Sequence, residues 1–279
     1  MMSRRFQVIA RQMWLFASLV VMMAGCQTER ETAEKYFNRA LAGLAGVDDL
    51  TFKGEAAVRN DDSGIYKQAV VFQGQLQNHK FLTLTTSHPT GKNSETAAYS
   101  AAGMNMDGLK GKMKHENGKW RTLTAGYLNA DWMVRLNPLE QLEYIGKSDK
   151  TVTEGYGAAR GTRVLRIQLT PEASRRMTEE ALKAQMEKLR SRIAEKGDIL
   201  YAPNGKARKR LLAVWERENR EMNRMLEQSE AAAVYHLTVD KTSHLPKKLT
   251  SERVLEFTDP SGRQRMETLV TEIHFSGYK

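Results

Sequence analysis

The sequence has 279 residues, of which 41% are hydrophobic and 27% are charged, and its formal net charge is +10. This balance is typical of a folded globular protein and excludes an intrinsically disordered chain, and a chain of this length can bury a sizeable core without crosslinks. Its single cysteine excludes a disulfide framework within the chain.

The first 26 residues are built like an export signal. Three arginines lie within the first eleven residues, and an apolar segment over 13–25 leads directly to Cys26. A basic start and a short apolar core that ends in small residues are typical of a secretory signal, and the apolar segment is too short for a permanent membrane span. We therefore predict that residues 1–25 are a signal peptide.

The residues around Cys26 resemble a bacterial lipobox. Ala24 and Gly25 precede the cysteine, and Met23 stands where leucine is usual. The resemblance implies that the Cys26 thiol takes a diacylglyceryl group, that the chain is cut before Cys26, and that the new amine is often acylated. Such acyl chains contribute about 0.8 kcal/mol of membrane-binding free energy per buried methylene. We expect a lipoprotein anchored on the extracytoplasmic face of the cell membrane. The alternative is an ordinary signal peptide ahead of a buried cysteine.

The first half of the mature chain is expected to contain one helix and a strand meander. Apolar residues at three- and four-residue steps over 36–44 indicate an amphipathic helix, which Gly46 ends. From Leu50 the period changes to two, which is typical of strands with one buried face, and Asn117-Gly118 suits a hairpin turn. The first expected strand opens at 50–54, ahead of a turn cluster at 61–64, and the following strands are expected over 65–76, 80–86, 99–106, 109–115 and 120–123.

The second half is expected to contain three helices and five more strands. Asn137 and Pro138 indicate the start of a short helix that ends at Gly146. A long helix over about 171–197 and a second one after Gly205 carry apolar stripes, which predicts an antiparallel helical hairpin. The remaining strands are expected over residues 151–154, 162–169, 233–239, 249–257 and 266–275.

These elements predict an α+β fold. About ten strands follow one another in hairpin order, and antiparallel pairing is the economical arrangement for such an order. No internal repeat or low-complexity linker divides the chain. We expect one domain over residues 26–279, with the helical hairpin at about 171–230 as an insert.

The order of these features resembles the exported lipoproteins of the LolA/LppX-like, outer-membrane lipoprotein carrier-like, superfamily. The features are the amino-terminal helix, the strand meander, the central helix that begins Asn137-Pro138-Leu139, and the late segments YHLTVD at 235–240 and LPKK at 245–248. The resemblance implies a curved antiparallel sheet, an incomplete β-barrel, that is covered by helices. In that superfamily the concave face takes acyl chains or lipidated cargo, and the long basic hairpin departs from its plainest members.

Alternating strand residues are the candidates for the lining of such a concave face. A strongly curved sheet needs helices or a ligand to cover it, and buried area rather than hydrogen bonding would hold an apolar ligand there. The alternative is that these side chains only pack beneath the helices. The candidates are Phe72, Leu84, Leu165, Ile167, Leu237 and Phe275.

The sequence lacks the compact motifs of common enzymes and metal sites. Its six histidines form no zinc helix, and there is no nucleophile elbow or phosphate loop. We therefore expect no catalysis, no cofactor and no metal. Met104, Met106, Met113 and His115 would suit Cu(I), but methionines that fill a sheet core are the competing interpretation.

The densest charge run contains Lys206, Arg208, Lys209 and Arg210. One interpretation is contact with an anionic surface, such as phospholipid headgroups, a wall polymer or an acidic partner. The other is a solvated helix face. An exported location makes nucleic acid a poor fit as the partner.

Together these features predict a membrane-anchored, non-enzymatic lipoprotein that binds a lipid-like or lipidated ligand as a carrier or sensor. The alternative is an interaction scaffold in envelope signalling or in sporulation and germination, because the long hairpin offers a platform for a protein partner. A third interpretation, an envelope enzyme, is disfavoured by the missing motifs.

Overall fold

A computed structural model describes residues 31–60, 66–87, 108–123, 133, 136–195 and 204–279. The helices within these residues are α2 (Ala33–Ala45), α4 (Pro138–Lys147), α5 (Pro171–Ala194) and α6 (Gly205–Glu227). The strands are β1 (Leu50–Asn60), β2 (Tyr66–Gln77), β3 (Phe81–Ser87), β4 (Lys110–Glu116), β5 (Lys119–Thr122), β6 (Lys150–Glu154), β7 (Thr162–Leu169), β8 (Glu230–Asp240), β9 (Pro246–Thr258) and β10 (Gln264–Ser276). The strand expected at 99–106 lies outside the described residues.

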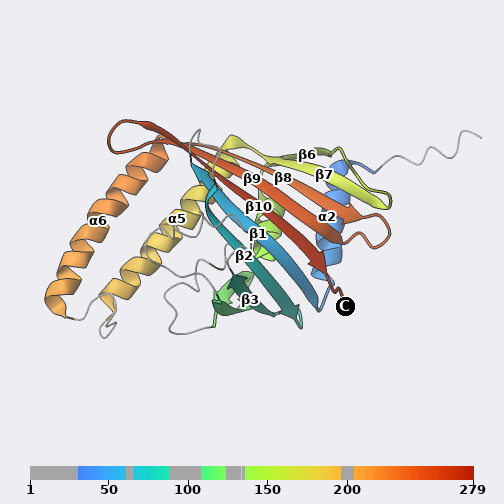
Figure 1. Ribbon diagram of the computed structural model, residues 1–279, viewed down its shortest axis with the longest axis horizontal. Helices are drawn as coiled ribbons and strands as arrows, with labels where there is room; N and C mark the ends of the chain where they lie inside the picture. Colours follow the sequence, from blue (N-terminus) through green and yellow to red (C-terminus); the bar gives the residue numbers. More distant parts are fainter. Residues whose placement is uncertain (1–30, 61–65, 88–107, 124–132, 134–135, 196–203) are drawn as a thin grey trace, which may run out of the picture. The chain divides into compact units, whose positions relative to one another are not determined.

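The ten strands form one antiparallel sheet in the order β5-β4-β3-β2-β1-β10-β9-β8-β7-β6 (Figure 1). The first and last strands of the sequence, β1 and β10, are neighbours in the middle of the sheet. The sheet does not close into a barrel, because β5 and β6 lie at its two opposite edges. Hydrogen bonding in the sheet therefore confirms the predicted antiparallel pairing and the incomplete barrel.

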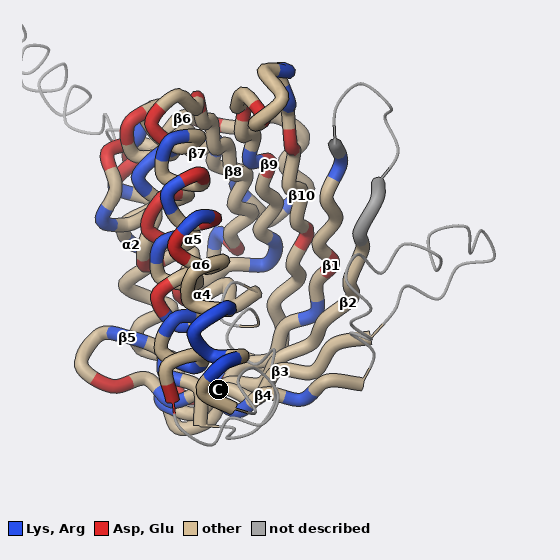
Figure 2. The backbone as a smooth tube through the Cα atoms, turned by 90° about the vertical axis from the view of Figure 1, so that its left-hand side faces the viewer, with Lys and Arg blue, Asp and Glu red and all other residues tan. Residues whose placement is uncertain are grey.

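The helices lie on the side toward which the sheet bends (Figure 2). Only α4 separates β5 from β6 among the described elements, so the chain must cross from one edge of the sheet to the other at this point. The buried side chains Leu139, Leu142 and Ile145 of α4 join the same core as Phe37 of α2. This is the helix-covered curved sheet that the resemblance to the LolA/LppX-like superfamily implies.

The period-two pattern places the apolar residues of each strand on the covered face. In β3, Leu82 and Leu84 are buried, whereas their neighbours are partly or fully exposed. The partners of these two leucines in β2 are Leu76 and Gly74. The core thus forms between the sheet and the helices, because side chains alternate between the two faces of a strand.

Two glycines allow aromatic rings to lie directly over the sheet. In the β1–β2 pair, Gly54 is opposite Phe72 and Gly74 is opposite Phe52. A Cβ atom on Gly54 would lie 2.6 Å from Cζ of Phe72, and one on Gly74 would lie 2.2 Å from Cζ of Phe52. Only glycine leaves room for these rings.

The start of α4 is as predicted, but its end is not. The Asn137 side chain accepts a hydrogen bond from the Leu139 amide, and Pro138 occupies the first helical turn. Gly146, which we expected to end the helix, continues it to Lys147, and Ser148 is the C-cap. A Cβ atom on Gly146 would lie 2.9 Å from Cδ1 of Leu41 in α2, so this glycine lies where α2 and α4 pack closely.

Helices α5 and α6 form the predicted hairpin between β7 and β8 (Figure 1). The Trp215 indole donates a hydrogen bond of 2.8 Å to the Met186 carbonyl, and the Arg190 guanidinium lies 5.2 Å from the Trp215 ring centre. The hairpin packs on β7, β8 and β9. It buries few of its own side chains, as only Ala173, Ser174, Ile193, Trp215 and Leu226 are buried along both helices. By contrast, α4 buries four of its ten residues.

Candidate functional site

The six side chains proposed to line a ligand site all lie on the covered face of the sheet. Leu165 in β7 is opposite Leu237 in β8. Ile167, the next residue on the same face of β7, is opposite Tyr235. The row that contains Leu165 and Leu237 reaches Phe72 through Leu249, Ile273 and Gly54. The structure therefore brings together residues that are far apart in the sequence, such as Gly54 and Ile273, which are 219 positions apart.

Phe275 and Leu84 belong to a neighbouring row of the same face. Phe275 is opposite Phe52, Phe52 is opposite Gly74, and Gly74 is opposite Leu84. The Phe52 ring is 6.3 Å from Phe72 and 6.4 Å from Phe275, between ring centres. These contacts make an aromatic cluster at the centre of the sheet.

All six candidates are buried, and none has more than 7% of its surface exposed. They share one core cluster with residues of α2 and α4. These side chains thus pack beneath the helices. Their role in ligand binding stays a prediction.

The same face carries a polar strip that the sequence analysis missed. The buried hydroxyls of Ser251 and Thr271 are 2.6 Å apart, and the Tyr235 hydroxyl donates to the sulfur of Met177 in α5 at 3.5 Å. Arg253, two residues after Ser251, points to this face, and its Nε atom is buried with no hydrogen-bond partner among the described residues. The alternation along β9 could have predicted this strip, because residues 249, 251 and 253 lie on the same face of the strand.

Burial also raises pKa values where α4 meets α5. Removal from water raises the pKa of Glu140 to about 7, and the nearby Glu143 carboxylate adds to this effect while Lys188 of α5 opposes it. Burial likewise raises the pKa of Tyr144. Glu140 therefore exchanges its proton near neutral pH, which makes this helix contact sensitive to pH.

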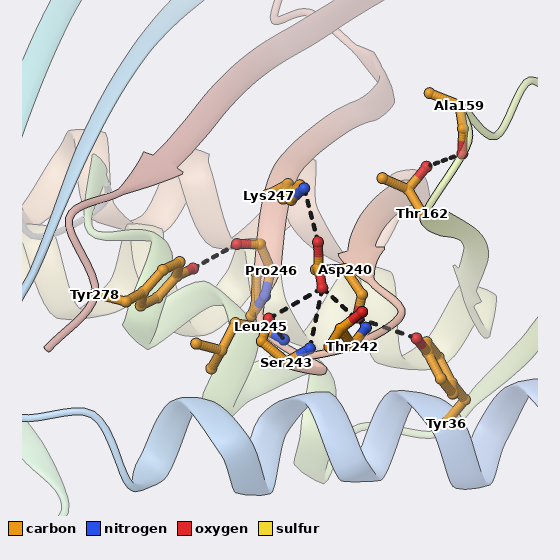
Figure 3. Close-up of polar contacts among 10 residues, drawn as sticks. All are labelled: Tyr36, Ala159, Thr162, Asp240, Thr242, Ser243, Leu245, Pro246, Lys247 and Tyr278. Carbon is orange, nitrogen blue, oxygen red and sulfur yellow. Dashed lines mark hydrogen bonds and ion pairs between the residues drawn. The ribbon is translucent and has the colours of Figure 1, made fainter.

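The late segments that carried the resemblance form the end of β8 and the start of β9, on either side of the turn that joins them (Figure 3). One Asp240 carboxylate oxygen is 2.7 Å from Nζ of Lys247, and the other accepts hydrogen bonds from the Thr242 and Ser243 amides at 2.9 and 3.0 Å. The Lys247 contact and these bonds hold the pKa of Asp240 well below its usual range. The Tyr36 hydroxyl of α2 donates to the Asp240 carbonyl at 3.3 Å. These contacts fasten α2 to the turn, so the segments serve the structure of the fold.

The four basic residues proposed for anionic contact lie at the start of α6. Lys206, Lys209 and Arg210 are exposed. Arg208 is only partly exposed, and its Nε atom is buried with no hydrogen-bond partner among the described residues. A helix turns by 100° per residue, so Arg208 lies on the face of Trp215, toward α5. Arg208 therefore does not share the exposed face of the other three, because sequence adjacency does not place residues on one helix face, and the anionic contact of these four residues stays a prediction.

The remaining candidate features are the lipidation site, the methionines considered for Cu(I), membrane-spanning helices and metal sites. Cys26, Met104 and Met106 lie outside the described residues, whereas Met113 is fully buried in the core. Across the described part of the chain, no helix combines the length and the apolar character needed to cross a membrane. Within the same residues there is no group of three or more side chains suited to hold a metal ion.

Comparisons with known proteins find similarity only at the level of solved structures. No protein-family model matches the chain, and no curated protein matches it by sequence. One similar structure is a LolA superfamily protein from Nitrosomonas europaea, at 8% identity and a TM-score of 0.26, covering 89% of this chain and 93% of that one. Another is a DUF1329 family protein from Desulfovibrio piger, at 8% identity and a TM-score of 0.23, with the same two coverages.

A third similar structure is lipovitellin, from work on its lipid–protein interactions. The identity is 8% and the TM-score is 0.31, and the match covers 83% of this chain. The chain spans only 25% of the length of lipovitellin. The strand order and the helix cover described above, rather than these similarities, define the fold.

Proposed function

We propose that the protein is an exported lipoprotein, anchored to the extracytoplasmic face of the cell membrane through Cys26, that binds a lipid-like or lipidated ligand as a carrier or sensor. One observation carries the proposal. The largely apolar inner face of the sheet is covered by two well-packed helices and by a hairpin that buries very few side chains. The proposal assigns no catalytic step and no cofactor.

The two parts of the cover differ in how firmly they are held. Burial of an apolar side chain contributes about 1.5–3 kcal/mol, so the four buried residues of α4 hold that short helix firmly. In α5, Ala173, Ser174 and Ile193 are the buried residues along 24 positions. Elements with few buried contacts open at the lowest free-energy cost. The hairpin is therefore the part of the cover that a ligand can displace.

The residues beneath the hairpin suit a ligand with an apolar body and a polar end. Ile167 and Leu237 lie next to the polar strip of Tyr235, Ser251 and Thr271. Acyl chains would be held by buried area, with little directional specificity. The Arg253 guanidinium would offer a charged hydrogen bond to a carboxylate or phosphate.

Organic extraction of the purified full-length chain, with Cys26 replaced by serine, tests the proposal. Mass spectrometry should find a copurifying lipid in near-stoichiometric amount. The Arg253→Gln variant should retain less of an anionic lipid, whereas the Arg160→Gln variant, in the exposed connection between β6 and β7, should retain as much as the parent. An empty extract from the parent protein would contradict the carrier or sensor function.

A second candidate function is an interaction scaffold in envelope signalling or in sporulation and germination. The observation that favours it is the burial of all six candidate side chains within one core cluster. In this case the protein's own helices fill the concave face. An empty extract, together with a melting temperature that added phospholipid or fatty acid does not change, would favour the scaffold.

A further inference from the structure

The outer face of α6 carries a stripe of cations. Helical steps of three and four residues place Lys206, Lys209, Arg210, Arg217, Arg220 and Arg224 within one narrow sector, and all six are exposed. The buried residues of this helix, Trp215 and Leu226, lie on the opposite side, toward the rest of the protein. At 1.5 Å per residue the stripe is about 27 Å long. We call these six residues the α6 stripe.

The amino-terminal half of the α6 stripe has no acidic neighbour within its helix, whereas Arg217, Arg220 and Arg224 each have a glutamate within four residues. Among the described residues, only Arg217 of the six forms an ion pair, with Glu218 at 2.7 Å. The first ten residues of the helix contain four basic residues and no acidic one. The adjacent helix α5 is different, because Glu179 lies 3.6 Å from Arg175 and 3.3 Å from Lys183. The two helices therefore differ less in total charge than in its distribution, because α5 has an acidic residue in its first turn and the first ten residues of α6 contain none.

The position of these cations opposes helix stability. The amino-terminal end of a helix carries a partial positive charge, and a cation there is unfavourable by about 0.3–1 kcal/mol. The first turn of α6 has no acidic residue, and the Asn204 side chain caps it by accepting a hydrogen bond from the Ala207 amide at 2.9 Å. A solvated helix face alone would gain from acids at this end, so this arrangement favours an anionic partner over simple solvation.

We infer that the α6 stripe is a docking surface for an anionic phospholipid bilayer. A straight, exposed row of cations matches a flat surface of negative headgroups, and each cation near such a surface strengthens binding about fivefold. Contact along the stripe would bring the hairpin to the bilayer. This inference goes beyond lipid carriage, because it requires no ligand beneath the sheet.

Cosedimentation of the full-length chain with vesicles tests the inference. The vesicles contain phosphatidylglycerol and phosphatidylcholine in equal parts, or phosphatidylcholine alone. The test variant replaces Lys206, Lys209 and Arg210 with glutamine. The control variant replaces Arg175, Arg176 and Lys183 of α5 with glutamine, which removes the same charge from the same hairpin. All chains share the amino-terminal segment, so its contribution to binding is common to them.

The test variant should bind the anionic vesicles at least about tenfold more weakly than the parent, and the control variant should stay within about twofold. Added salt should weaken the binding of the parent to anionic vesicles, so that the affinities of the three chains become similar. Equal losses in both variants, or no loss in the test variant, would overturn the inference. Stripe-dependent binding to soluble polyphosphate but not to vesicles would also overturn it, in favour of an anionic polymer.

Discussion

Replacement of Gly74 by alanine should destabilise the protein, although alanine normally suits a strand better than glycine. The added Cβ atom would lie 2.2 Å from Cζ, 2.6 Å from Cε1 and 2.7 Å from Cε2 of Phe52. The Phe52 ring must therefore move, but it has 1% exposure and is enclosed by Phe72 and Phe275. Overpacking of this kind costs about 3 kcal/mol at its upper end. The gain from replacing glycine is about 0.5–1 kcal/mol, which leaves a net loss of about 2 kcal/mol.

Urea unfolding of the full-length chain, followed by far-ultraviolet circular dichroism, measures this loss. Gly43→Ala in α2 is the matched control, because its Cβ atom would lie no closer than 3.5 Å to any neighbour, the nearest being Cδ2 of Leu245. That variant should gain about 0.5–1 kcal/mol from helix propensity. Combining Gly74→Ala with Phe52→Leu should cost about 1 kcal/mol less than the sum of the single changes. A Gly74→Ala protein as stable as the parent, or strict additivity in the pair, would refute the role of Phe52 over Gly74.

Three further predictions concern α4, the hairpin and the anchor. Burial raises the folded-state pKa of Glu140 from 4.5 to about 7, so the folded state prefers the protonated side chain. The protein is therefore most stable with respect to this group below pH 4.5 and loses stability as the pH rises through 7. Glu140→Gln should remove about 1–2 kcal/mol of this loss in unfolding experiments across that window, and an unchanged pH profile would contradict the assignment. Amide hydrogen exchange should be at least about tenfold faster in the middle of α5 and α6 than in α2 and α4, and equal protection would count against a displaceable hairpin. Exported Cys26→Ala protein should leave the membrane fraction, and retention of this variant as firmly as the parent would disprove the lipid anchor.

The hairpin connects the two proposals without making either depend on the other. Its inner side is weakly packed over the polar strip, and its outer side carries the α6 stripe. If both proposals hold, docking of the stripe would place the displaceable cover next to the source of an anionic lipid. Vesicle binding and copurification of lipid report on the two sides separately, so failure of one leaves the other testable.

Local chemistry made much of the fold predictable from the sequence. Asn137 and Pro138 started α4 as expected, because capping depends on a few adjacent residues. Leu82 and Leu84 shared the buried face of β3, because alternation along a strand is a local property. Gly146 does not end α4, which continues to Lys147, and its neighbour Leu41 belongs to α2, a contact that is not local.

By itself, the sequence determined which residues form strands, which side of each strand is apolar, and where basic residues concentrate. Only the tertiary structure decided that β1 pairs with β10, that α4 covers the open side, and that Ser251 meets Thr271. It also separated Arg208 from the α6 stripe and gave Glu140 its raised pKa. The reason is physical: periodicity and capping act over a few residues, whereas strand pairing, burial and desolvation depend on partners that are distant in the chain.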